Sequence, residues 1–228
     1  MSTDRLPPLP DDALTAEQRA VAERIVAGPR GRLGGPFVPV LHSPQAAEHL
    51  QALGAYLRFG CGLPARVFEL AVLLVARHRD QGFEWAHHEP LARAAGLPDE
   101  VIAAIAADER PTGLTDAEVA AYDLVTEALR GNDVAQRTYE RAVAQFGERG
   151  VVELVVTAGY YTTLAMVMNL ARTPVPPGAP VLPARNRDER GRPCPPPRTG
   201  CTTRCTAPVR SRCSSCPASA ARPGAGTG

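Results

Sequence analysis

The sequence contains no lysine, so all 25 basic residues are arginine. Aromatic residues are also scarce, at 5% of the chain. Residues 1–184 hold 16 arginines and 22 acidic residues, a net charge of −6, whereas residues 185–228 carry a net charge of +7. An acidic body with few aromatics lacks the basic, aromatic-bearing surface to which nucleic acids bind. We therefore expect no nucleic-acid partner.

The body of the chain also lacks a cysteine pair. Five of the six cysteines lie in the C-terminal stretch, at Cys194, Cys201, Cys205, Cys213 and Cys216. Only Cys61 precedes residue 184, and a single cysteine forms neither a disulfide framework nor a Cys-x-x-Cys redox motif.

No secretory signal stands at the start, because Met1–Asp12 contains three prolines and no apolar core, and we expect a cytoplasmic protein. Residues 151–171 are long and apolar enough to raise a membrane span as an alternative. Glu153 and Asn169 within this run favour a buried bundle helix instead, since polar groups are costly in lipid. We expect no membrane partner.

The sequence is rich in helix start and stop signals, and strand signals are almost absent. Capping boxes begin at Thr15 and Thr115, and Pro44 follows a capping serine. The Gly- and Pro-rich residues 31–39 predict an irregular loop able to cover a pocket, with Phe37 as its one large apolar side chain. The whole pattern predicts an all-α fold, with helices over residues 15–28, 43–60, 64–79, 84–95, from 98 onward, 115–130, 133–146 capped by Asp133, and 151–172.

The composition changes near residue 184. Residues 1–183 form the predicted helical domain. Residues 184–228 contain almost no large apolar side chains, so they bury too little surface to offset chain entropy, and we predict a disordered tail. The spacings Cys201-x-x-x-Cys205 and Cys213-x-x-Cys216 leave a zinc site as the alternative, although the tail lacks the small apolar core of structural zinc sites.

Glu69 is the most informative single residue, because its predicted helix is otherwise apolar on every face. A buried carboxylate must find a hydrogen-bonding partner or take up a proton with a raised pKa. Such carboxylates cluster at functional sites. A structural ion pair with Arg77 or Arg141 is the alternative.

A second feature is the segment 83–88 at the start of the fourth predicted helix. Glu84 and His88 are four residues apart and share one helical face, with Trp85 bordering it. This arrangement suits a small pocket with an aromatic wall and a proton donor that titrates near neutral pH; a solvated surface pair is the alternative. Di-iron bundles use the spacing Glu84-x-x-His87 but need it twice with two further glutamates. We find no second copy and expect no metal site.

One spacing pattern joins these residues: Glu69 is followed by Gln81, Glu84 and His88, and then by the run Leu-Ala-Arg-Ala-Ala-Gly-Leu-Pro. Over roughly residues 39–183 the pattern resembles the carboxymuconolactone decarboxylase and AhpD-like superfamily. The resemblance implies an AhpD-like helical bundle with the active site in a helical hairpin, and a homo-oligomer, often a trimer or hexamer. In the hydroperoxidase branch, two redox cysteines stand where this chain has Gln81 and Glu84. Thiol peroxide reduction needs those cysteines, so we expect no alkylhydroperoxidase activity and no cofactor.

The pattern is closest to the decarboxylase branch, which acts on a lactone carrying carboxylates. Loss of carbon dioxide leaves electron density that must spread into the ring carbonyl, and the site then needs an acid to protonate carbon. We assign His88 as the general acid or base, Glu84 as its orienting group or proton partner, and Glu69 as the group that fixes its tautomer. Expected substrate contacts are Trp85, His87, Tyr160, Phe37 and Arg77, with Arg79, Tyr161 and Asn169 as further candidates.

These residues predict a carboxy-lyase-like enzyme that acts on a small lactone or keto acid as its small-molecule partner. Three alternative functions stay open. The first is that of a cofactor-free superfamily member that catalyses another small-molecule reaction, such as an isomerisation in specialised metabolism. The second is a non-catalytic helical oligomer, and the third is a peroxidase that uses Cys61, which lacks a nearby second cysteine.

Overall fold

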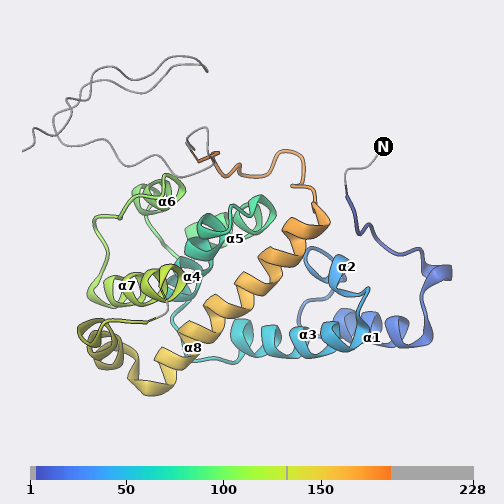
Figure 1. Cartoon of the computed structure of the whole chain (residues 1–228), viewed down its shortest axis with the longest axis horizontal. Coiled ribbons are helices and arrows are strands. Elements are labelled where there is room, and N and C mark those ends of the chain that lie inside the picture. Colours follow the sequence, from blue (N-terminus) through green and yellow to red (C-terminus); the bar gives the residue numbers. More distant parts are fainter. Residues whose placement is uncertain (1–3, 132, 186–228) are drawn as a thin grey trace, which may run out of the picture. The chain divides into compact units, whose positions relative to one another are not determined.

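The computed structural model describes residues 4–131 and 133–185. Every regular element in these residues is helical, which confirms the predicted all-α fold (Figure 1). A short 3-10 helix, η1 (Asp11–Ala13), comes first. The α-helices that follow it are α1 (Ala16–Ala27), α2 (Phe37–Val40), α3 (Pro44–Phe59), α4 (Ala65–His78), α5 (Gly82–Ala94), α6 (Asp99–Ala106), α7 (Asp116–Arg130) and α8 (Gln136–Ala171).

The helix ends lie where local hydrogen bonds favour them. At Thr15 and at Thr115 the side chain accepts a hydrogen bond from the backbone N–H three residues on, and the side chain of that third residue accepts one from the backbone N–H of the threonine. These two capping boxes begin α1 and α7 as predicted. Gly96, after α5, has a φ of +89°, a value that suits glycine because it lacks a Cβ atom.

Two local predictions were wrong. Asp133 does not cap the next helix, because its Oδ1 accepts a bond from the N–H of Val134 and the N-cap of α8 is Ala135. The predicted loop over residues 31–39 contains the single turn α2, which buries Phe37 in a small apolar cluster with α1 and α3.

The predicted break near Gly147 is present, since Gly147 has φ 66° and ψ 173° and divides α8 into two helical parts.

α4 is the central helix of the described residues, and it packs against α5, α7 and α8 (Figure 1). All of its residues from Val67 to Arg77 are buried except Leu74. Burying one large apolar side chain contributes roughly 1.5–3 kcal/mol, so this helix supplies much of the core. Its burial explains the apolar sequence around Glu69, which is itself 8% exposed.

α8 runs across α4, between α3 and α7 (Figure 1). By length and composition it is apolar enough to cross a membrane, a test that core helices also pass. Because 56% of its most apolar stretch is buried inside the molecule, packing accounts for much of this composition.

Residues 173–185 follow α8, and Pro183 and Arg185 contact Arg77 near the end of α4 (Figure 1). Apart from Ala184 and Arg185, the tail predicted from residue 184 lies outside the described residues, as do its five cysteines and the zinc alternative.

Candidate active site

A pocket of about 240 Å³ lies among α3, α5, α8 and the loop that precedes α2. Its volume is just below the roughly 300–1,000 Å³ usual for small-molecule sites, which suits a small metabolite. The titratable groups on α5 that face it are Glu84, His87 and His88. Its aromatic and apolar walls are Phe37, Phe59, Phe83, Tyr160, Tyr161, Leu164 and Met168.

Glu69 and His88 form a buried pair behind this pocket. His88 Nδ1 lies 2.7 Å from Glu69 Oε2, and the two residues are 3% and 8% exposed. A carboxylate only accepts hydrogen bonds, so Nδ1 carries the proton and donates it. The other ring nitrogen, Nε2, is then an unprotonated acceptor on a ring that lines the pocket. In this structure Glu69 pairs with His88 and with neither Arg77 nor Arg141.

Burial lowers the pKa of His88 below its ordinary value of 6.5, while the hydrogen bond and the charge of Glu69 raise it. Burial prevails, so His88 is held in its neutral form. Tyr161 supports the ring edge-on, with the two ring centroids 5.0 Å apart.

Glu84 occupies a different environment from Glu69. It is 3% exposed, and its Oε2 is buried without a hydrogen-bond partner in the described residues. Burial raises the pKa of Glu84 well above its ordinary value of 4.5. Glu84 shares the pocket with His88, but no hydrogen bond joins their side chains in the part of the chain described here. The role of orienting His88 belongs to Glu69.

The other predicted site residues on this side of the molecule also line the pocket. His87 packs edge-on against the ring of His88, with the two centroids 5.0 Å apart, and burial lowers its pKa to about 4. Tyr160 and Tyr161 on α8 pack edge-on against each other at 5.2 Å, and Phe37 closes the side near α2.

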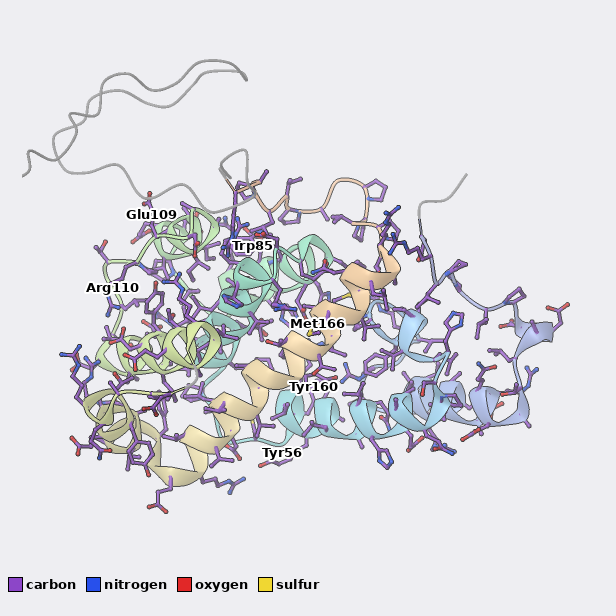
Figure 2. The ribbon with its side chains drawn as sticks, in the orientation of Figure 1. Tyr56, Trp85, Glu109, Arg110, Tyr160 and Met166 are labelled. Carbon is purple, nitrogen blue, oxygen red and sulfur yellow. The ribbon has the colours of Figure 1, made fainter. Side chains whose placement is uncertain are left out.

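Trp85 does not line the pocket. It is 3% exposed and belongs to the main core cluster around α4 (Figure 2). Successive helix residues point about 100° apart, and α5 is buried on more than one face, so the residue after Glu84 turns into the core. Asn169 is also outside the pocket: it accepts a bond from Gln81 Nε2 at 2.8 Å and donates to the carbonyl of Arg79 at 2.9 Å.

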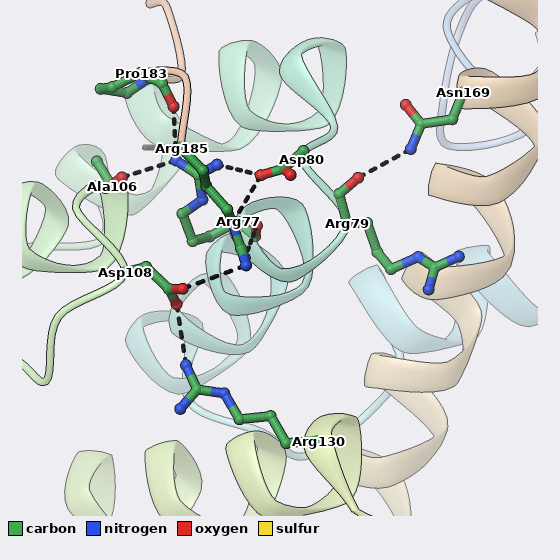
Figure 3. Close-up of polar contacts among 9 residues, drawn as sticks. All are labelled: Arg77, Arg79, Asp80, Ala106, Asp108, Arg130, Asn169, Pro183 and Arg185. Atoms are coloured by element: carbon green, nitrogen blue, oxygen red, sulfur yellow. Dashed lines mark hydrogen bonds and ion pairs between the residues drawn. The ribbon is translucent and has the colours of Figure 1, made fainter. Parts of the chain in front are cut away.

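Arg77 lies away from the pocket and has a structural role (Figure 3). Its Nη1 donates to the carbonyls of Ala106 at 2.9 Å and Pro183 at 2.7 Å, and its Nη2 pairs with Asp80. Arg185 completes the network by donating to the carbonyl of Arg77 at 2.6 Å. The predicted substrate contact of Arg77 is therefore corrected: this guanidinium is 3% exposed and ties the residues after α8 to the end of α4.

We expect the substitution Arg77→Met to lower the free energy of unfolding by roughly 1–3 kcal/mol, because it removes the donor to the carbonyls of Ala106 and Pro183 and one of the cationic partners of Asp80. Urea unfolding of the variant measures this loss. Arg79→Met is the matched control, since the Arg79 side chain makes no hydrogen bond in the described residues and only its carbonyl is used. Equal stabilities of the two variants would contradict the structural role of Arg77.

Sequence analysis missed the basic residues of the pocket. Arg30 and Arg32 come from the loop after α1, and Arg58 from the end of α3. The loop and α3 are far apart in the sequence, so no spacing pattern joins the three arginines. The available signal was weaker: Arg32 lies in the loop predicted to cover a pocket, and Arg30 directly precedes that loop.

No three His, Cys, Asp or Glu side chains come together as a possible metal site within residues 4–131 and 133–185. Cys61, the one cysteine in these ranges, donates its S–H to the carbonyl of Leu57 at 2.8 Å and does not line the pocket.

Part of the chain matches a known protein family. Residues 44–127 match the Carboxymuconolactone decarboxylase family. These 84 residues of the 228-residue chain are similar to that family. The matched segment runs from α3 to α7 and contains Glu69, Glu84 and His88. The loop with Arg30 and the helix with Tyr160 lie outside it.

The helical fold around this segment is similar to that of a solved structure. A crystal structure of a protein of unknown function from Agrobacterium tumefaciens, described as a candidate antioxidant defence protein AhpD, matches with a TM-score of 0.55 and 22% identity. The match covers 60% of this chain and 94% of that one. It confirms the predicted AhpD-like helical fold. No curated protein is similar enough to the chain to count as a match.

Proposed function

We propose that the pocket catalyses an acid–base reaction on a small lactone or keto acid, with decarboxylation as the first candidate. One observation carries this proposal: Glu84 and His88 face the same pocket, and their surroundings shift their pKa values in opposite directions. Such a pair supplies a neutral carboxylic acid and a neutral imidazole at the same pH. Oppositely shifted groups in one cleft are the usual sign of an acid and a base in catalysis.

In the decarboxylation of a lactone acid, the bond between a ring carbon and its carboxylate breaks, and carbon dioxide leaves. The electron pair of that bond passes through the conjugated ring to the carbonyl, which becomes an enolate. Glu84 donates its proton to the carbon beside that carbonyl and becomes a carboxylate.

His88 restores the acid for the next turnover. Its Nε2 takes a proton from solvent and passes one to Glu84, while Glu69 stabilises the imidazolium that forms in between. The ionised Glu84 itself favours that imidazolium, because opposite charges in a buried site attract strongly.

The free Nε2 of His88 favours a second candidate, a proton transfer between two atoms of the substrate. Decarboxylation needs no base to begin, whereas an isomerisation does. His88 would remove a proton from carbon, and Glu84 would deliver one to another atom of the same molecule.

Incubation of the full chain with γ-carboxymuconolactone in D₂O tests both candidates. Release of carbon dioxide, with one deuterium in the product at the carbon beside the carbonyl, supports decarboxylation if Glu84→Gln and His88→Gln abolish it. Exchange of deuterium into the lactone without release of carbon dioxide supports proton transfer. A folded protein that does neither overturns the acid–base proposal for this substrate class.

We also propose that the chain forms a homo-oligomer. In support of this, α8 exposes Val152, Met166 and Leu170, each more than half exposed, and α3 adds the exposed Phe59, which lines the pocket; Figure 2 labels Met166. Exposed large apolar side chains are common at protein interfaces. Sedimentation velocity of the full chain measures the assembly directly, and a monomer at all concentrations would overturn the proposal.

A further inference from the structure

The pocket holds more positive than negative charge. Arg30, Arg32 and Arg58 line it, and none of them forms an ion pair in the described residues. The one acid on its wall, Glu84, favours its neutral form because it is buried without a partner. Glu69, the other nearby acid, is engaged with His88. The arginines therefore have no carboxylate of the protein to neutralise them.

Arg30 is held in place by two contacts, and its Nε–H is a buried donor without a partner in the described residues. Its guanidinium lies over the ring of Phe37, 4.6 Å from the centroid, and its Nη2 donates to the hydroxyl oxygen of Tyr160 at 3.3 Å. A buried donor left without a partner is destabilising, by about 1–3 kcal/mol, and a bound acceptor removes this penalty.

Tyr160 and Arg58 extend the same surface. The Tyr160 hydroxyl receives a bond from Arg30, so its own proton remains available to a second acceptor. Tyr160 is 4% exposed, and burial raises its pKa, which keeps that proton on the oxygen. The charge of Arg58 reaches His87, His88, Tyr160 and Tyr161, because it lowers the pKa of all four groups.

We infer that Arg30 and Arg58, together with the Tyr160 hydroxyl, bind a carboxylate of the substrate and leave its reacting end against Glu84 and His88. A planar guanidinium with free N–H groups matches the two oxygens of a carboxylate, and such charge-assisted bonds are among the strongest in proteins. The assignment deepens the proposed function and rests on it for the identity of the reacting end. Arg30 and Tyr160 lie outside residues 44–127, so segments flanking the family match contribute this recognition.

Binding of simple dicarboxylates to the full chain tests the inference without any need for turnover. Succinate, glutarate and adipate are the probes, and adipamide is the uncharged match of adipate. Ligands that bind only the folded state raise its melting temperature, and at a fixed ligand concentration the rise is larger when the Kd is lower. We expect at least one dicarboxylate to raise the melting temperature of the wild type, whereas adipamide does not. We expect Arg30→Gln and Arg58→Gln each to raise the Kd for that dicarboxylate by about 10- to 100-fold.

Arg137→Gln is the matched control, since Arg137 is an exposed arginine on α8 that does not line the pocket. The Kd of this variant for the dicarboxylate should equal that of the wild type. Glu84→Gln should bind the dicarboxylate as tightly as the wild type even if it has lost turnover. Arginine-dependent binding without turnover of any lactone would leave the recognition site standing and overturn only the proposed reaction. Equal Kd values in the wild type and both pocket arginine variants, or no stabilisation by any of the three dicarboxylates, would overturn the inference.

Discussion

Replacing Glu84 by glutamine is expected to lower kcat by about 10²- to 10⁴-fold, the range that a positioned proton donor usually contributes. Glutamine has nearly the same shape as a protonated glutamate, so the pocket keeps its size, but its amide gives up no proton. KM should change far less than kcat, because the substrate carboxylate is held elsewhere in the proposed arrangement. Steady-state kinetics on the decarboxylation substrate measures both constants.

The matched control for this variant is Glu89→Gln. Glu89 lies on the same helix and is 8% exposed, but it pairs with Arg93 and does not line the pocket. Its substitution should leave kcat within a few-fold of the wild type. A similar loss of kcat in both variants would mean that Glu84 matters only for the integrity of α5.

The Glu84→Gln variant also has a predicted pH signature. In the folded protein the pKa of Glu84 is above 4.5, so the folded state holds the proton more tightly than the unfolded state does. The stability that this proton contributes is present below pH 4.5 and is lost as the pH rises through the folded pKa. The melting temperature of Glu84→Gln relative to the wild type should therefore increase from pH 4 toward neutral pH.

Replacing His88 by glutamine is expected to lower kcat by a similar factor, about 10²- to 10⁴-fold, because the proton relay loses its imidazole. Glu69→Gln should lose activity as well, since the partner that fixes the tautomer of His88 is changed. The two residues act as one unit, so the double variant should lose little more than His88→Gln alone. Kinetics of the two single variants and the double variant form the cycle that measures this coupling.

His87→Gln is the control for that cycle. His87 lines the same pocket but does not bond to Glu69, so its loss should affect KM more than kcat. Full additivity of the Glu69 and His88 substitutions would contradict the relay, even if each single variant were inactive.

The sequence predicted the helices well because their ends depend on short-range hydrogen bonds. Capping boxes at Thr15 and Thr115 and the glycine at Gly96 act within one turn of the chain, and their signals are visible in four consecutive residues. Asp133 was misassigned because its side chain bonds to the very next residue. α2 was missed since it is a single turn held by the burial of Phe37, a tertiary effect.

The site residues that were predicted correctly were also those with a local signal, whereas the others depend on tertiary packing. Glu69 stood out because a carboxylate in an apolar helix needs a special environment, and its bond to His88 was assigned through the resemblance. Trp85 and Arg77 were placed in the pocket by proximity in sequence, whereas the direction of each side chain depends on which faces of α4 and α5 are covered. Arg30, Arg58 and Tyr160 meet only after folding, as they belong to three separate elements.

The central claim is that Glu84 is a protonated acid in the folded protein at neutral pH, facing an unprotonated His88. Infrared difference spectroscopy of the wild type minus Glu84→Gln tests it directly, because the C=O stretch of a protonated carboxyl is distinct from the bands of a carboxylate. The account predicts a protonated carboxyl band at pH 7 that is present in the wild type and absent from the variant, and that Glu89→Gln does not remove. A carboxylate band in its place would show that Glu84 is ionised and would contradict the proposed acid.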